Sequence, residues 1–178
     1  MDILSQPSFS PKGHLHGVVE IPAGTNQKFE YDKQAFLFRP DVRDGTARRI
    51  NFLPYPVNYG FVPSTKMDKA RGGDGDPLDV LVIAESIPTG TLVEVQPIGL
   101  LLLKDLGEWD NKVLAIPADP HQRILTATNW AEFQRDYSAI RHILELFVLY
   151  YDGLGTMTLM GWGDEKAAVV EVERWQVT

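Results

Sequence analysis

The 178-residue sequence contains no cysteine, no long apolar run and no excess of basic residues. Without cysteine, the chain has no disulfide framework, no thiolate nucleophile and no cysteine-ligated zinc or iron–sulfur centre. Its longest apolar run, 98–103, includes Gly99 and falls far short of the roughly 20 residues that cross a bilayer. Lysine and arginine number 17 against 24 acidic residues, which gives a formal net charge of −7. Because such a chain has no basic block to grip a phosphate backbone, we expect no nucleic-acid partner and no membrane association.

The composition is close to that of an ordinary globular domain, with 44% hydrophobic and 23% charged residues. These values exclude a disordered or collagen-like chain. The length is enough for one good core, and there is no internal repeat, low-complexity tract or linker. We therefore predict a single domain over residues 1–178, with a loose N-terminal arm over residues 1–16. An acid at position 2 and the lack of a signal-peptide-like apolar stretch predict a cytoplasmic protein.

Short β-like runs bounded by Gly, Pro and Asp turns follow one another along most of the chain. The predicted strands cover residues 18–21, 28–32, 35–38, 48–52, 79–84, 92–96, 98–103, 112–116, 156–162 and 167–172. Between 129 and 151, apolar residues three and four apart instead predict one long amphipathic helix, capped by Thr128 or Asn129 and ended by Gly153. The predicted fold class is α+β, mainly β: a compact β-barrel with a helix packed against it.

The densest chemical signal is Asp74-Gly75-Asp76-Pro77-Leu78-Asp79, which places three carboxylates on a turn before an apolar strand. Carboxylates held so close raise each other's pKa unless a cation lies between them, and oxygen ligands select hard ions such as Mg²⁺ or Mn²⁺. The same residue types are also common in turns that bind nothing. A calcium loop of the EF-hand kind is excluded, because its sixth position requires glycine and here is Asp79.

Three further groups are weak by themselves. They are Asp105 with Asp110 in a loop between strands, Glu20 with Lys28 and Glu30 on adjacent strands, and Tyr55 with Tyr59 around a proline-kinked turn. Solvated hairpin tips, an exposed strand face and ordinary aromatic packing explain each of them equally well. The four histidines show no metal-ligand spacing.

Taken together, these residues resemble the soluble family I inorganic pyrophosphatases. The resemblance covers roughly residues 18–175 and is carried by the order and spacing of the stretches 20–24, 26–33, 55–61 and 74–82, followed by Asp105, Asp110, Lys112 and the helix end at Tyr150. It implies an OB-like five-stranded barrel with flanking helices. The implied reaction is Mg²⁺-dependent hydrolysis of pyrophosphate to two orthophosphates by a metal-activated water, with no covalent intermediate. It also implies a homo-oligomer, since bacterial members are typically hexamers.

The resemblance implies a role for each site residue. The implied metal ligands are Glu20, Glu30, Asp74, Asp79, Asp105 and Asp110. Asp76 resembles the general base. The groups implied to hold the phosphates are Lys28, Arg48, Tyr59, Lys112 and Tyr150. The physical reason for metal ions is independent of the resemblance: seven carboxylates would repel pyrophosphate, and bound divalent ions such as Mg²⁺ or Mn²⁺ reverse the sign of the local field.

The sequence departs from the family pattern at two places in the site. Arg48 starts the strand predicted after the hairpin and is our choice for the phosphate-binding arginine, with Arg49 as the alternative. The family usually has a Tyr-Lys pair at the helix end, and here we read Tyr150-Tyr151, so one cation is missing unless Lys166 or the second arginine replaces it. Three alternatives to a pyrophosphatase stay open: a non-catalytic relative kept for binding or assembly, an OB-type binding module, and another metal-dependent phosphohydrolase.

Overall fold

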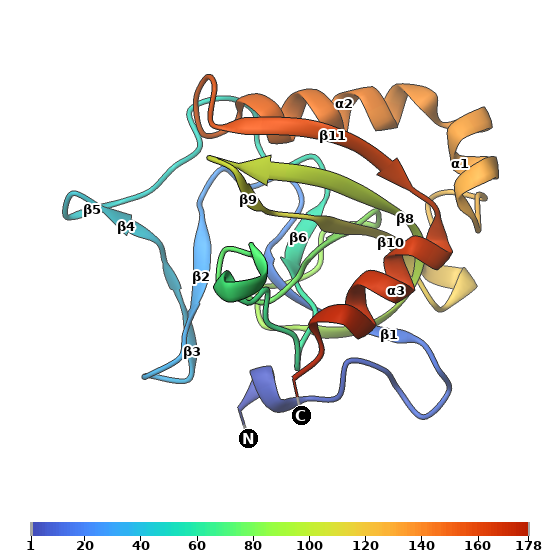
Figure 1. Cartoon of the computed structure of the whole chain (residues 1–178), viewed down its shortest axis with the longest axis horizontal. Helices are drawn as coiled ribbons and strands as arrows, with labels where there is room; N and C mark the ends of the chain where they lie inside the picture. The colour runs from blue at the N-terminus through green and yellow to red at the C-terminus, as the bar shows by residue number, and fades with distance from the viewer. Residues whose placement is uncertain (1, 178) are drawn as a thin grey trace.

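A β-sheet that closes on itself forms the centre of the computed structural model, which describes residues 2–177 (Figure 1). The ring contains β1 (Leu15–Ile21), β6 (Asn58–Phe61), β7 (Asp79–Val82), β10 (Lys112–Pro117) and β8 (Leu92–Asp105), and β8 pairs with β1 again. β11 (Met157–Gly163) and β9 (Glu108–Trp109) extend the sheet from β8. The predicted α+β class and the barrel are therefore confirmed.

Two small hairpins form an arm beside the barrel (Figure 1). The first pairs β2 (Phe29–Asp32) with β3 (Leu37–Pro40), and the second pairs β4 (Val42–Arg43) with β5 (Thr46–Ala47). The strand predicted over 48–52 is reduced to a single bridge between Gln27 and Arg49. The two strands predicted over 92–103 are one continuous strand, β8.

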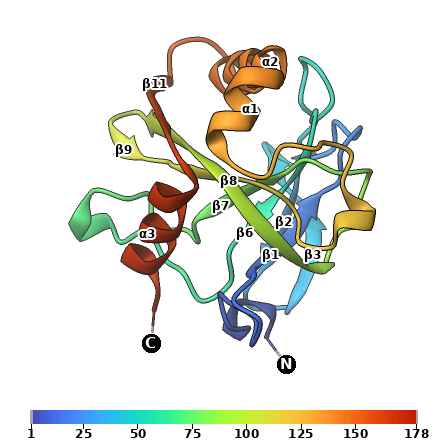
Figure 2. The same cartoon turned by 90° about the vertical axis from the view of Figure 1, so that its right-hand side faces the viewer.

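Three helices lie on the outside of the barrel in the described residues: α1 (Trp130–Asp136), α2 (Ser138–Tyr150) and α3 (Glu165–Trp175). Figure 2 shows α1 and α2 on one side of the barrel and α3 on another. Short 3₁₀ helices occur at Ile3–Ser5, Lys69–Arg71 and Pro120–Gln122. No helix within residues 2–177 is long and apolar enough to cross a membrane.

The long helix predicted between 129 and 151 is interrupted at Tyr137. Asn129 is its N-cap, as predicted, and its Oδ1 accepts a hydrogen bond from Glu132 N at 3.0 Å. Tyr137 leaves the helical conformation with φ −129° and ψ 29°. Its hydroxyl bonds Thr126 through the backbone N at 3.1 Å and the side-chain Oγ1 at 2.8 Å. This tertiary contact accompanies the change of direction between α1 and α2.

The strand predicted over 167–172 is wrong, because these residues belong to α3. Asp164 caps this helix through a hydrogen bond from Ala167 N to Oδ1 at 2.8 Å. Ala168, Val172 and Trp175 are buried at a spacing of four and three, which is the helical period. They pack with Leu100 and other β8 and β10 side chains, so α3 seals one face of the barrel.

The segment before β1, predicted as a loose arm, makes specific contacts with the barrel. Ser8 Oγ donates to Pro63 O at 2.8 Å, and Ser64 N donates to Leu4 O at 2.8 Å. The hydroxyl of Tyr31 donates to Asp2 Oδ1 at 2.8 Å. These bonds hold the segment along the edge of the structure.

Strand register brings charged residues to one side of the barrel. β10 runs parallel to β7, and Lys112 stands opposite Asp79 at the start of both strands. On the other side of β7, β6 pairs closely with β1 at Gly60, where a Cβ would lie only 1.8 Å from Val18 O. Glycine is therefore required beside Tyr59, whose side chain reaches the same charged region.

Candidate active site

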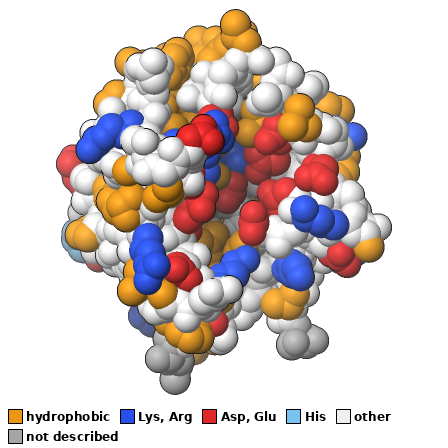
Figure 3. Space-filling view, turned by 90° about the vertical axis from the view of Figure 1, so that its left-hand side faces the viewer, with side chains coloured by type: hydrophobic (Ala, Val, Ile, Leu, Met, Phe, Trp, Pro, Cys, Tyr) orange, Lys and Arg blue, Asp and Glu red, His pale blue; other side chains and the backbone are white. Residues whose placement is uncertain are grey.

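Acidic and basic side chains line a cavity of about 440 Å³ that opens on one face of the molecule (Figure 3). All seven acidic residues predicted as metal ligands or general base line this cavity. They come from β1, β2, the 74–79 turn, the end of β8 and the loop before β10. Lys28, Arg48 and Tyr59 also line it, and Lys112 contacts two of its carboxylates. Residues far apart in the sequence thus meet in one place.

The 74–79 turn is held by its own hydrogen bonds. Asp74 Oδ1 accepts from Asp76 N at 2.9 Å, and Gly75 N donates to Met67 O at 2.7 Å. Burial, and then the nearby charges of Asp79 and Asp76, raise the pKa of Asp74 against the effect of its hydrogen bond. Asp76 is exposed, and its one ion-pair partner in the described residues is Lys33, at 3.4 Å.

Lys112 is the centre of the buried part of the site, with 1% of its surface exposed. Its Nζ donates to Asp79 Oδ2 at 2.6 Å, to Asp110 Oδ1 at 2.8 Å and to the hydroxyl of Tyr59 at 3.4 Å. Tyr59 in turn donates to Asp79 Oδ2. Burial alone would lower the pKa of Lys112, but its two carboxylate partners outweigh that effect and raise it. The ammonium therefore stays charged.

Two of the carboxyl groups have pKa values shifted strongly upward. Burial raises the pKa of Glu20 to about 8, and the negative charge of Asp79 adds to the shift. Glu20 also joins the barrel to the arm, because its Oε1 accepts from Tyr31 N at 3.0 Å. Burial likewise raises the pKa of Asp110, against the attraction of Lys112. A cation placed beside these two groups would favour their ionised forms.

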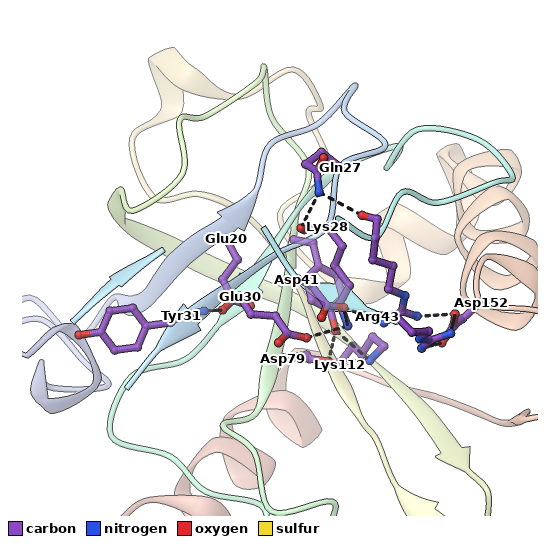
Figure 4. A network of polar contacts seen from close by, with 12 residues as sticks. Glu20, Gln27, Lys28, Glu30, Tyr31, Asp41, Arg43, Asp79, Lys112 and Asp152 are labelled. Carbon is purple, nitrogen blue, oxygen red and sulfur yellow. Dashed lines mark hydrogen bonds and ion pairs between the residues drawn. The ribbon is translucent and has the colours of Figure 1, made fainter. Parts of the chain in front are cut away.

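The arm formed by the two hairpins and the residues beside them contributes the other basic groups. Figure 4 shows two of them, Lys28 and Arg43, in the same region as Asp79 and Lys112. Lys28 Nζ lies 3.1 Å from Glu30 Oε1 and 3.7 Å from Asp41 Oδ2. Arg48 Nη1 donates to the same Asp41 oxygen at 3.1 Å. Asp41 thus connects two of the predicted phosphate-binding cations.

The structure places Arg48, and not Arg49, in the cavity. The Arg48 side chain is 11% exposed and lies among carboxylates. Arg49 is exposed and donates to Asn26 Oδ1 at 3.2 Å, outside the cavity. Arg43 also lines the cavity, although the sequence reading did not select it. Lys166, considered earlier as a replacement cation, is exposed on α3 and does not line the cavity.

The predicted site residue Tyr150 does not line this cavity, whereas its neighbour Tyr151 does. Tyr150 is 42% exposed and lines a second cavity, which also contains Arg48 and Tyr151. The ring of Tyr151 stacks on Phe147, one helical turn earlier, with centroids 5.3 Å apart. Burial raises the pKa of Tyr151 to about 12, partly offset by Lys112. The helix end in the site is therefore Tyr151-Asp152, and an acid follows the tyrosine.

The donor set fits a hard divalent cation, although the carboxylates are not gathered around one point. Within residues 2–177, no three His, Asp or Glu side chains are placed to ligate a single ion. The Nζ of Lys112 lies between Asp79 and Asp110. Asp105 Oδ1, however, is buried and accepts no hydrogen bond from the described residues. A buried, unpartnered carboxylate oxygen beside other carboxylates suits an oxygen-ligated metal ion such as Mg²⁺.

Comparisons with known proteins agree with this geometry. The sequence model of the family described as inorganic pyrophosphatase matches residues 17–177. The inorganic pyrophosphatase of Synechocystis sp. is 34% identical over 179 residues, covering 97% of this chain and 96% of that protein. That of Saccharolobus solfataricus is 32% identical over 172 residues, covering 94% and 93%. A crystal structure of inorganic pyrophosphatase from Thermus thermophilus superposes with a TM-score of 0.81 at 29% identity, covering 97% of this chain and 95% of that one.

Proposed function

The chain belongs to the inorganic pyrophosphatase family, and from this premise we propose how its own residues carry the reaction. It is a hydrolase that splits pyrophosphate into two orthophosphates. The family uses a divalent metal ion, and we propose Mg²⁺ for this chain, with Mn²⁺ as a substitute. The observation that carries the proposal is the meeting of all seven predicted acids with Lys28 and Arg48 in one cavity, where Lys112 contacts two of these acids.

We propose that the carboxylates hold several metal ions. Asp74, Asp79 and Asp110 would ligate the ion bound most tightly, and Asp79 would share a second ion. Asp105, with its unpartnered Oδ1, would ligate a further ion together with Asp110. Glu20 and Glu30 would act as outer ligands. Divalent ions held by these carboxylates would neutralise charge on the substrate and lower the pKa of a bound water towards about 7.

Asp76 is proposed as the general base that removes a proton from the attacking water. Its carboxylate is exposed towards the cavity, and in the described residues only a 3.4 Å ion pair with Lys33 engages it. The adjacent Asp74 is buried further and bonds the backbone of Asp76. A carboxylate that is free to accept a proton, fixed next to metal-binding carboxylates, has the placement that general-base catalysis requires.

The cationic groups are proposed to bind the two phosphates. Lys28 and Lys112 supply compact ammonium charges, and Arg48 supplies a planar fork that matches two phosphate oxygens. Arg43 is added to this set because it lines the same cavity. Tyr59 and Tyr151 supply hydroxyl groups at the inner wall. These groups stabilise the charge that develops on the leaving phosphate.

The test is release of orthophosphate from pyrophosphate with Mg²⁺, with and without a chelator. Asp76→Asn removes the base and should lower kcat by roughly 10²- to 10⁴-fold. Glu173→Gln, an equal charge change at an exposed position on α3, is the matched control and should keep full activity. If the wild-type protein leaves pyrophosphate intact, or if Asp76→Asn keeps a rate within a few-fold of wild type, these role assignments are wrong.

We further propose that the chain acts as a single domain in a cytoplasmic homo-oligomer, a hexamer by analogy with bacterial members of the family. The exposed apolar side chains Ile143, Leu146 and Tyr150 on α2 support an interface between copies. Light scattering on the purified protein gives the mass of the assembly directly. A monomer at working concentration would contradict the oligomer.

A further inference from the structure

Asp152 forms an ionic bridge to Arg43 and Arg48, and all three residues line the cavity. Figure 4 shows Asp152 beside Arg43. Nη1 and Nη2 of Arg43 lie 3.5 Å from its two carboxylate oxygens, and Arg48 pairs with it as well. The bridge joins the turn after α2 to the β4–β5 hairpin, over 109 residues of sequence. Burial would raise the pKa of Asp152, but the two guanidinium groups outweigh it and lower the pKa. Asp152 is therefore ionised at neutral pH.

The bridge leaves little free positive charge on these two arginines. Arg48 is held between Asp152 on one side and Asp41 on the other. Arg43 directs both of its terminal nitrogens at Asp152. Carboxylate and phosphate oxygens bind the guanidinium fork in the same way, with two parallel hydrogen bonds. Asp152 and a phosphate group therefore cannot occupy the same edge of either arginine together.

We propose that Asp152 is an internal competitor of pyrophosphate and orthophosphate for Arg43 and Arg48. The proposal rests on the proposed function, in which these arginines bind phosphate. An arriving phosphate displaces the carboxylate from the arginines. When the product leaves, the carboxylate pairs with the arginines again. Asp152 can move because its side chain is 33% exposed and Gly153, with φ +114°, follows it. Asp152 thus weakens phosphate binding and favours release of the product.

The opposite role has an opposite signature. If Asp152 served to orient the arginines for the substrate, removing its charge would loosen them and weaken phosphate binding. If it competes, removing its charge frees them and strengthens phosphate binding. The sign of the change in affinity therefore separates a competitor from a positioning residue.

The experiment uses Asp152→Asn, which keeps the shape of the side chain and removes its charge. The matched control is Asp44→Asn, because Asp44 lies in the same hairpin, is exposed and has no ion pair in the described residues. Asparagine also tolerates the positive φ of 53° at that position. The measurements are KM and kcat for pyrophosphate with Mg²⁺, and the Kd of inorganic phosphate by calorimetry.

For Asp152→Asn we expect KM and the phosphate Kd to fall about fivefold. A fivefold change corresponds to about 1 kcal/mol, which is the free energy of a partly exposed ion pair. The control should leave both constants unchanged. A rise in both constants for Asp152→Asn would make it a positioning residue, and no change would make the bridge irrelevant; either overturns the proposal. Asp152→Ala repeats the test without a residual hydrogen-bond acceptor. Wild-type protein that fails to hydrolyse pyrophosphate refutes the proposed function instead, while the phosphate Kd still reports the competition.

Discussion

Replacing Lys112 with methionine tests whether its ammonium balances the buried carboxylates. Methionine keeps a stem of similar size but removes two ion pairs, at 2.6 Å to Asp79 and 2.8 Å to Asp110. Removing one partner of a buried ion pair costs about 3–5 kcal/mol, because an uncompensated charge remains. Asp79 is 18% exposed and is partly hydrated after the change, so we expect the lower end, about 3 kcal/mol.

The same substitution should cost much less stability when a divalent cation is bound. A loss of about 3 kcal/mol lowers the Tm by roughly 6–12 °C for a domain of this size. Asp79 and Asp110 are also the proposed ligands of Mg²⁺, and a bound divalent cation replaces the positive charge that the variant lacks. We therefore expect the difference in Tm between variant and wild type to shrink to about half or less in excess Mg²⁺.

The assay is thermal unfolding followed by circular dichroism, in EDTA and in excess Mg²⁺. Lys166→Met is the control, since Lys166 is exposed on α3 and forms no ion pair in the described residues. The control should leave Tm nearly unchanged in both buffers. Equal losses of Tm for Lys112→Met in EDTA and Mg²⁺, or no loss in EDTA, would refute the idea that the ammonium and the metal ion serve the same carboxylates.

Three other outcomes follow from the site. Tyr151→Phe should lower kcat/KM about tenfold through loss of a hydroxyl in the cavity, whereas Tyr150→Phe should not; equal effects would contradict the placement of the helix end. Glu20, whose pKa burial raises from 4.5 to about 8, holds a proton at neutral pH in the metal-free protein, so its contribution to stability is fully present below pH 4.5 and is lost as pH rises through about 8. Mg²⁺ must displace this proton, so its affinity should rise between about pH 6 and pH 8 with proton release, seen by calorimetry in two buffers; a pH-independent affinity would be evidence against it. Gly60→Ala should lower Tm by more than about 5 °C, because its Cβ would lie 1.8 Å from Val18 O; an unchanged melting curve would contradict that close approach.

The parts of the fold that were predictable are those fixed by local sequence. The apolar run at β7 and the cap at Asn129 are set by neighbouring residues, and both are present. α3 was misread because a short apolar run such as 167–172 fits a buried strand and a helix equally well. The Asp164 cap and the buried Trp175 would have indicated the helix. The break at Tyr137 depends on Thr126 across a turn, which spacing alone does not reveal.

The seven acids that line the cavity were named in advance through the resemblance to the pyrophosphatase family, since most of them are weak signals by themselves. Tyr151 could also have been found, since it lies on the same helical stripe as Leu144 and Phe147, whereas Tyr150 does not. The bridge from Asp152 to Arg43 leaves no such signal. It joins a helix end to a hairpin 109 residues away, and only the tertiary structure brings them together.

Ion pairs between the cavity's own residues determine which cations are available to an anionic substrate. Lys112 is paired with Asp79, Lys28 with Glu30, and Arg48 with Asp152. None of these three cations is therefore free for pyrophosphate until its carboxylate finds another partner. Divalent ions are suitable partners for Asp79 and Asp110, and binding of such ions to these carboxylates would free Lys112 for the phosphate. Asp152 is not among the proposed metal ligands, so phosphate itself must displace its carboxylate from the arginines. Metal binding should then strengthen phosphate binding both directly and by freeing Lys112, and the Asp152→Asn change should add to that effect independently, because it acts on different cations.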